Sequence, residues 1–389
     1  MGKRFVMTAV TVLAASLLPA ARASAQATCG GNLGPCSTVP SSNTAYGTTA
    51  AEFLLLAPSA RGEALGGSFA ALTTDVSSVY YNPAGLAQMD APGAMASSMN
   101  YIAGTKYAWG AIGIPFSGGA KAIGVSVSNF GFSDQPVYTV DDPSGANGQV
   151  YSVSETAIGL TYSQQFSDRF SAGITAKYIN DQLGQVSGSA FAVDFGTSFH
   201  ALIGGRPIRA SFVVQNLGTT LSHNGHVLDL LVQRGQPQGQ DSVLQEGATA
   251  SLVTKDWPLP VMFRVGLAYD VFQATAGRLT VVGEFTQPNN NNPGFNAGGE
   301  YAVNLGSSGF SIAGRASVTY WPDNGLAAPD SSTVGFSGSS NGSSQYRMSA
   351  GGGLYYRPHG TGFGIGFDYA YRNMGLLGGV NMISVGVTW

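Results

Sequence analysis

The sequence predicts an all-β protein: a closed antiparallel transmembrane β-barrel of about 14 strands, preceded by a partly helical plug, or hatch. Three observations predict this fold. The chain opens with an export signal, and only 10% of its 389 residues are charged whereas 55 are glycine. Bulky apolar residues also recur at every second position through most of its length. Soluble domains usually carry about 25% charged residues.

The first residues have the three parts of a secretory signal peptide. MGKRF is basic, residues 6–18 are apolar, and Ala23-Ser24-Ala25 is a small-residue cleavage site. We expect cleavage after Ala25, which removes residues 1–25. The alternative is a membrane anchor, but the apolar stretch falls short of the roughly 20 residues that a spanning helix needs. Together with the composition, the signal predicts a protein of the outer membrane.

Two cysteines, Cys29 and Cys36, follow the cleavage site. In an oxidising compartment they could close a small loop, so we favour a local disulfide over two free thiols. No further ligands stand near them, and we expect no metal and no cofactor. The formal net charge of −3 gives no basic field for nucleic acid.

Residues 26–93 do not alternate, and we expect them to form the plug. The segment is helix-like in pieces and ends in a turn at Asn82, Pro83, Ala84 and Gly85. Asn82 precedes a proline and is therefore extended, whereas Gly85 permits the chain to reverse. An unstructured tail is the alternative, but the density of Leu, Phe and Tyr argues against it.

Residues 94–389 are predicted to form the barrel. In TGFGIGFDYAY, residues 361–371, one face is Phe, Ile and Tyr, and the other is Gly, Ala and one Asp. A soluble sandwich would instead combine an apolar face with a face rich in Lys, Glu and Thr. The bulky face therefore meets lipid and the small face meets a confined interior. We predict strands at 94–103, 106–114, 121–132, 151–166, 169–180, 189–200, 207–217, 260–271, 278–287, 293–303, 309–321, 345–357, 362–371 and 379–389.

The connections give an independent check on this strand list. The three long ones, at 133–150, 218–259 and 322–344, all follow odd-numbered strands, as the outer loops of such barrels do. A missed pair of strands would not break this parity, and 218–259 is long enough to hide one. The apolar stretch VLDLLV at 227–232 either folds inward or offers a surface to a partner, and we favour inward folding.

Charged residues are predicted on the inner face of the barrel. They are Lys177, Asp194, Arg209, Arg264, Asp270, Glu284, Glu300, Arg315, Arg347 and Asp368. Because the signs are mixed in a narrow lumen, we expect structural ion pairs with one another or with Arg61, Glu63 and Asp75 of the plug. A solute path lined by these charges is the alternative interpretation.

The last strand has an apolar face made of Ile383, Val385, Val387 and the terminal Trp389. A terminal aromatic residue preceded by alternating apolar residues looks like the signal that the barrel-assembly machinery reads. The alternative is an ordinary final strand with an interfacial tryptophan. The expected surroundings are thus the assembly machinery and outer-membrane lipid.

The stretch ALGGSFAALTTDVSSVYYNPAGLAQM resembles the N-terminal motif of the FadL superfamily, which pairs a 14-stranded barrel with a hatch that carries Asn-Pro-Ala. Here that triplet is Asn82-Pro83-Ala84. The stretches LPVMFRVGLAYD, NAGGEYAV and the C-terminal 39 residues look more like the PorV/PorQ branch. The branch often has His-Arg before the closing Ile-Ser, where this chain has Asn381-Met382.

This resemblance implies two functions. PorV-like barrels bind exported proteins of the type IX secretion system, which gives the leading hypothesis of a secretion-associated, protein-binding barrel. FadL-like barrels move hydrophobic small molecules past a hatch, which gives the alternative. The chain has no Gly-x-Ser-x-Gly motif, and its one close histidine pair, His223 and His226, has no third ligand beside it, so we expect no enzyme activity.

Overall fold

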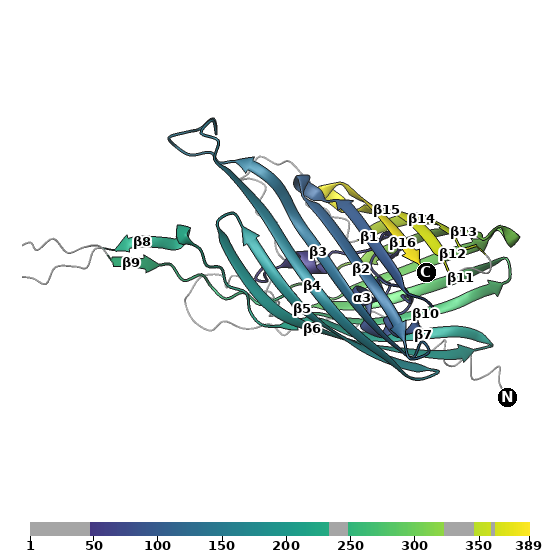
Figure 1. Ribbon diagram of the computed structural model, residues 1–389. Coiled ribbons are helices and arrows are strands. Elements are labelled where there is room, and N and C mark those ends of the chain that lie inside the picture. Colours follow the sequence, from purple (N-terminus) through teal and green to yellow (C-terminus); the bar gives the residue numbers. More distant parts are fainter. Residues whose placement is uncertain (1–46, 233–247, 323–345, 359–361) are drawn as a thin grey trace, which may run out of the picture. The chain divides into compact units, whose positions relative to one another are not determined.

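The computed structural model describes residues 47–232, 248–322, 346–358 and 362–389. Fourteen antiparallel strands form a closed barrel, in the order β1-β16-β15-β14-β13-β12-β11-β10-β7-β6-β5-β4-β3-β2 (Figure 1). They are β1 Gly93–Asn100, β2 Lys106–Phe116, β3 Lys121–Pro136, β4 Val150–Ser167, β5 Phe170–Leu183, β6 Val186–Ile203, β7 Arg206–Gly218, β10 Met262–Ala274, β11 Gly277–Pro288, β12 Gly294–Asn304, β13 Phe310–Tyr320, β14 Tyr346–Tyr356, β15 Gly364–Asn373 and β16 Gly379–Thr388.

The predicted fold class and strand number are confirmed. Each predicted strand coincides with one barrel strand, and the largest shift is at β3, which extends to Pro136 rather than residue 132. The first and last strands pair from Gly93 opposite Thr388 to Asn100 opposite Asn381. Every barrel strand therefore has two neighbours, so no backbone edge is left unpaired.

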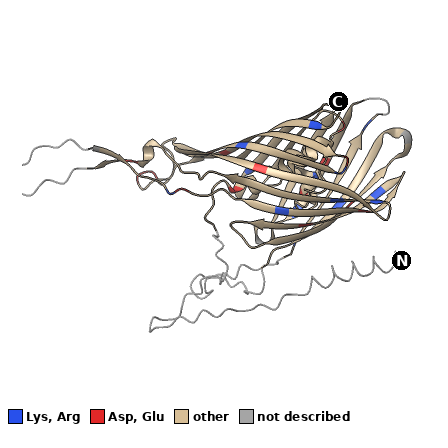
Figure 2. Ribbon diagram, turned by 90° about the horizontal axis from the view of Figure 1, so that it is seen from below, with Lys and Arg blue, Asp and Glu red and all other residues tan. Residues whose placement is uncertain are grey.

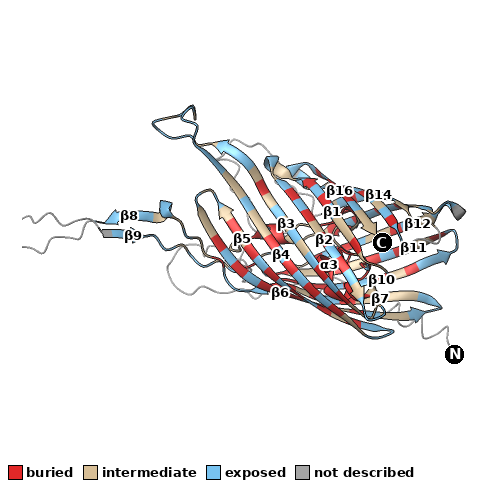
Figure 3. Cartoon of the chain, in the orientation of Figure 1, coloured by how far each residue is buried: buried red, intermediate tan, exposed pale blue. Residues whose placement is uncertain are grey.

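Burial alternates along the strands, as Figure 3 shows by the change from red to pale blue at successive positions. On β15, Phe367 is 46% exposed and faces outward, whereas Asp368 is 5% exposed and faces the lumen. Charged positions are isolated bands on otherwise uncharged strands (Figure 2). A closed barrel with an apolar outer face is typical of a barrel that is surrounded by lipid.

The connections divide the barrel into two ends. One, which we name the long-loop end, carries the connections 137–149, 219–261 and 321–345. The other, the short-turn end, carries tight turns such as 168–169, 204–205 and 275–276. The predicted parity of long and short connections is thereby confirmed.

The connection 219–261 contains two further strands, β8 Asp229–Val232 and β9 Ala248–Ser251, which pair with each other and not with the barrel. The hidden pair of strands therefore exists but leaves the barrel at 14. The preferred prediction that VLDLLV folds inward is wrong, since Leu231 is 81% exposed. Because β8 and β9 pair with each other, the backbone groups on their facing edges are hydrogen-bonded without any contact to the lumen. The segment can therefore lie outside the barrel.

Residues 47–92 lie inside the barrel as short helical pieces: η1 Glu52–Leu55, α2 Ala60–Ala64, α3 Ser78–Tyr81 and η2 Pro83–Gln88. We call this segment the plug. Its α2 lies against β13 to β16, and η2 lies against β4, β5 and β6 on the opposite wall. None of the helices in the described part of the chain is long and apolar enough to cross a membrane.

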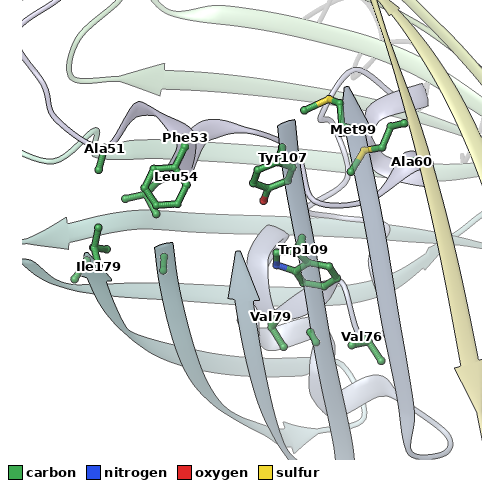
Figure 4. Packing of buried hydrophobic residues seen from close by; sticks show 14 of the residues in the cluster. Ala51, Phe53, Leu54, Ala60, Val76, Val79, Met99, Tyr107, Trp109 and Ile179 are labelled. Carbon is green, nitrogen blue, oxygen red and sulfur yellow. The ribbon is translucent and has the colours of Figure 1, made fainter. Parts of the chain in front are cut away.

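The plug spans the lumen from end to end. The amide of Ala50 donates to the Pro258 carbonyl at the long-loop end (3.0 Å), and the Pro92 carbonyl accepts from the Trp389 amide at the short-turn end (3.0 Å). Between them, Phe53, Leu54 and Val79 face the aromatic rings of the wall (Figure 4). The signal peptide, Cys29 and Cys36 lie outside the described residues.

Glycine on the inner wall makes room for the plug. A Cβ at Gly173 of β5 would lie 2.5 Å from the backbone carbon of Pro83. A Cβ at Gly351 of β14 would lie 2.7 Å from Ala64. Real Cβ atoms do not approach other atoms so closely, so plug and wall touch directly at these points. Part of the high glycine content is thus explained by plug packing.

A closed barrel makes a simple prediction for electrophoresis. Because all strands are paired in a ring, the folded protein should resist the detergent until it is boiled. An unheated sample should then migrate faster on a gel than a boiled one. Identical migration of the two samples would contradict a closed barrel.

Candidate functional site: a lumen divided by the plug

The helix α2 is fixed to the wall at both ends. At its start, Ser59 caps the helix by accepting from the Gly62 amide (3.2 Å), and the Ala60 amide donates to Ser384 Oγ on β16 (2.7 Å). At its end, the chain turns at Gly66 with φ of 65°, a conformation that favours glycine. The Gly66 carbonyl accepts from Asn296 Nδ2 at 2.7 Å. This short helix is thus held across the lumen.

Charged side chains clamp α2 to three strands. Arg61 Nε lies 2.8 Å from Glu300 on β12, and Arg61 Nη1 lies 3.3 Å from Asp75 of the plug. Arg315 on β13 contacts both Glu300 and Asp368, each at 2.6 Å. We call these five residues, with Tyr355, whose hydroxyl donates to Asp368 at 2.5 Å, the central ion network.

The structure places the ten predicted charges on the inner face and pairs most of them. Lys177 lies 2.6 Å from Asp194, Arg209 pairs with Asp270, and Arg264 lies 3.7 Å from Glu284. Glu300, Arg315 and Asp368 belong to the central ion network. Arg347 differs: it has no ion-pair or hydrogen-bond partner within the described part of the chain.

Sequence reasoning missed two inward arginines. Arg372 lies 3.1 Å from Glu63 of the plug, and Arg278 lies 3.7 Å from Glu300. Arg372 shares the parity of Asp368 but falls one residue beyond the predicted end of its strand. Extending the strand by one alternation would have found it.

The plug divides the lumen into two chambers. The short-turn chamber has a volume of about 350 Å³ and is lined by Arg61, Asp75, Tyr355 and Asp368 among others. The long-loop chamber has a volume of about 720 Å³ and reaches Gly66 and Asn296. The helix α2, Leu65 and the central ion network lie between them.

The short-turn chamber reaches both faces of the wall. Besides lumen residues it is lined by Ile365 and Val387, whose side chains belong to the outer face of β15 and β16. An outer groove of about 490 Å³ over β16, β1, β2 and β3 shares Ala94, Met95 and Val387 with it. The wall is thin here because Gly366, Gly386 and Met95 face one another across three strands.

The residues Asn82, Pro83, Ala84 and Gly85 form a tight turn at the wall of β5 and β6. Asn82 Oδ1 accepts from the Ala84 amide (3.1 Å), and its Nδ2 donates to the carbonyls of Ala70 (3.0 Å) and Thr197 (3.1 Å). A Cβ at Gly85 would lie 2.4 Å from the Thr73 carbonyl. The motif therefore ties two parts of the plug to each other and to the barrel.

Two plug tyrosines add neutral contacts. Burial raises the pKa of Tyr80 to about 12 and also raises the pKa of Tyr81, so both phenols stay neutral. The Tyr80 hydroxyl donates to the Leu54 carbonyl (3.1 Å), while its own carbonyl accepts from Gln215 (2.5 Å). Because both phenols stay neutral at pH values below these raised pKa values, the hydrogen bonds do not depend on pH there.

The terminal residues Ile383, Val385, Val387 and Trp389 lie along the outer face of β16 and just beyond it. Within the described ranges, no group of three His, Cys, Asp or Glu side chains could hold a metal ion.

These features define a class: an outer-membrane-type β-barrel of 14 strands with an internal plug. No family model and no curated protein matches the chain. Among solved structures it is similar to CymD, a monoaromatic hydrocarbon channel, at 13% identity and a TM-score of 0.50, over 86% of this chain and 97% of that one.

Two further structures cover similar shares. A Pseudomonas aeruginosa FadL homologue has 12% identity and a TM-score of 0.48, over 85% of this chain and 98% of that one. The Pseudomonas putida toluene transporter TodX has 11% identity and a TM-score of 0.47, over 85% and 96%. The similarity to CymD shows a shared barrel fold, and the PorV/PorQ branch stays a prediction.

Proposed function

We propose that the protein is an outer-membrane channel for small hydrophobic molecules, with the short-turn chamber as part of its path. The observation that carries this proposal is the chamber that reaches residues of both wall faces at β15, β16 and β1. A hydrophobic solute leaving an aqueous lumen gains free energy by passing into lipid, at about 25 cal/mol per Å² of apolar surface. A thin, glycine-lined wall is a suitable place for that passage.

The fold similarity supports the same reading. The barrel of CymD, described as a monoaromatic hydrocarbon channel, shares the strand architecture over nearly its whole length. Transport at this end would require α2 to move, because α2 and the central ion network separate the two chambers. The long-loop end would face the outside, as the long loops of such barrels do.

A substitution in the chamber tests this proposal. Gly386 faces the lumen, and a Cβ there would meet only Met95 at 3.6 Å and the Ala94 carbonyl at 3.8 Å. A Gly386→Leu side chain should therefore fold normally and fill part of the chamber. We expect uptake of a small uncharged aromatic such as toluene, measured in cells that express the protein, to fall at least fivefold.

The matched control is Gly314→Leu, since Gly314 lies on β13 with nothing within 4 Å of its Cβ position. This variant should retain uptake. Equal uptake by Gly386→Leu and the unaltered protein would exclude the chamber from the path. No uptake by the unaltered protein over cells without it would reject the channel itself.

A second candidate is the secretion-associated, protein-binding barrel, which the β8–β9 hairpin favours. Leu231 of β8 and Val253 after β9 are 81% and 95% exposed, and such apolar exposure is typical of interaction surfaces. The intact mass of the complex extracted gently from its own membrane separates the candidates. An excess of a few hundred daltons would support a hydrophobic ligand, and one of tens of kilodaltons a protein partner.

In either case the proposed surroundings are outer-membrane lipid around the apolar face and the barrel-assembly machinery at the β16 terminus. The Ile383, Val385, Val387 and Trp389 series supports the second of these, because the first three share the outer face of β16 and Trp389 directly follows the strand.

A further inference from the structure

The long-loop chamber differs in chemistry from the short-turn chamber. Three arginines on three strands line its volume of about 720 Å³: Arg264 on β10, Arg347 on β14 and Arg372 on β15. Two carboxylates, Glu52 and Glu284, also line it. Charged side chains do not bind an apolar solute favourably, so the proposed hydrophobic channel does not explain these residues.

The two carboxylates are already engaged. Glu52 Oε1 accepts from Asn290 and from Thr49, and Glu284 Oε2 accepts from the Ala70 amide of the plug at 3.2 Å. The second oxygen of Glu284 lies 3.7 Å from Arg264, its nearest cation. Neither acid forms an ion pair with Arg347 or Arg372.

Arg347 and Arg372 form a pair of neighbouring cations. Arg372 is opposite Ser349 in the β14–β15 register, so Arg347 is its diagonal neighbour on the same inner face. Long side chains at diagonal positions on one face of a sheet come within reach of each other, so the two positive charges repel. Such repulsion is unfavourable unless an anion lies between or beside the two groups.

Both arginines keep donors free. Arg372 gives Nη1 to Glu63, but its buried Nε has no hydrogen-bond partner. Arg347 uses none of its five donors on the described protein. A buried donor without a partner is costly, and Arg372 Nε is such a donor. Arg347 is half-buried and faces the same chamber, so the pair points to a ligand that accepts hydrogen bonds.

The rest of the lining suits a polar ligand. Asn290, Asn291 and Asn296 bring amides to the chamber, and the buried Oδ1 of Asn296 has no partner. The indole ring of Trp321 also lines the chamber and packs over Gly294. A Cβ at Gly294 would lie 2.7 Å from that ring. Amides and an indole ring can hold hydroxyl groups and a flat carbon face.

We propose that the long-loop chamber binds a small hydrophilic oxyanion, a carboxylate or a phosphate, through Arg347 and Arg372. Arginine forms paired hydrogen bonds to both groups, because its planar fork matches their oxygen spacing. Arg347 supplies the free guanidinium, and Arg372, anchored by Glu63, supplies the fixed one. This site lies across α2 from the short-turn chamber, where the hydrophobic solute is proposed to leave the lumen.

The test is calorimetric titration of the full chain in detergent micelles. The probes are inorganic phosphate and gluconate, with uncharged sorbitol as the reference for binding that needs no anion. We expect at least one anion to bind and sorbitol not to bind. Arg347→Gln should weaken that binding at least tenfold, whereas Arg347→Lys should weaken it less, because the charge remains.

Arg169→Gln is the matched control, since Arg169 lies in a short turn at the opposite end with a side chain that is 71% exposed. It removes the same charge and should bind as the unaltered protein does. The gel shift on heating shows that each variant is folded. Equal binding by Arg347→Gln and Arg169→Gln, or no binding of either anion at 10 mM by the folded protein, would overturn the proposal. A preference between gluconate and phosphate identifies which oxyanion the site takes.

Discussion

A Gly173→Leu variant is expected to lower the free energy of unfolding by about 3 kcal/mol or more, the sum of an overpacking cost and lost hydrogen bonds. Even a Cβ at this position would lie 2.5 Å from the Pro83 carbon, 2.6 Å from its carbonyl oxygen and 2.8 Å from the Ala84 amide. These are backbone atoms at the start of η2, so no side-chain rotation relieves the collision. The Asn82–Gly85 turn must move away from β5.

Displacement of the turn has a second consequence. Asn82 would lose its bond to the Thr197 carbonyl on β6, which holds the plug to the wall. Urea unfolding followed by tryptophan fluorescence measures the stability, and conductance in planar bilayers measures whether the lumen opens. We expect a lower urea midpoint and a higher conductance. The Gly314→Leu variant, on the lipid-facing side of β13, should change neither; similar values for both variants would refute direct contact between plug and wall.

A Glu300→Gln variant is expected to have the second large effect, a loss of about 3–5 kcal/mol in stability. Glu300 is 2% exposed and contacts Arg61 at 2.8 Å and Arg315 at 2.6 Å. Glutamine keeps the shape but removes the only charge that lies between these two guanidinium groups within the described ranges. Of the other acids in the network, Asp75 contacts Arg61 and Asp368 contacts Arg315.

The loss should appear in both stability and permeability. We expect the barrel to convert to its slow-migrating form at a lower temperature on gels, and small-ion conductance to rise as α2 loosens. Asp168→Asn is the control, because it also removes one acid but from a turn where the side chain is 86% exposed. Surface pairs of this kind contribute about 0–1 kcal/mol. If the two variants behaved alike, the central ion network would not hold the plug.

The barrel could be predicted in detail because a membrane imposes one rule on every strand. Alternation such as Phe367 outward and Asp368 inward repeats wherever one face meets lipid, and this period fixes both strand and register. The inward face could be predicted for the same reason. Strand ends were less certain, because β3 runs to Pro136 and β5 to Leu183, four and three residues past their predicted ends.

The interior could not be predicted to the same degree. Which charges pair depends on strand neighbours that are far apart in sequence, such as Arg61 and Glu300, and on how the plug crosses the lumen. The division into two chambers follows from the course of residues 47–92, which has no periodic signal. The β8–β9 pair was foreseen only as a possible hidden pair within 218–259, because four-residue strands are too short for alternation to distinguish them from a loop.

The course of the plug restricts how this protein can assemble. Residues 50 and 92 are bonded at opposite ends of a lumen that glycines fit closely to the plug. Pushing the segment lengthwise through a finished ring would require each of those contacts to open in turn. We therefore expect the pairing of β1 with β16 to complete around an N-terminal segment that is already in place. Because Gly93 of β1 directly follows the plug, a misplaced plug would shift the register in which β1 pairs with β16.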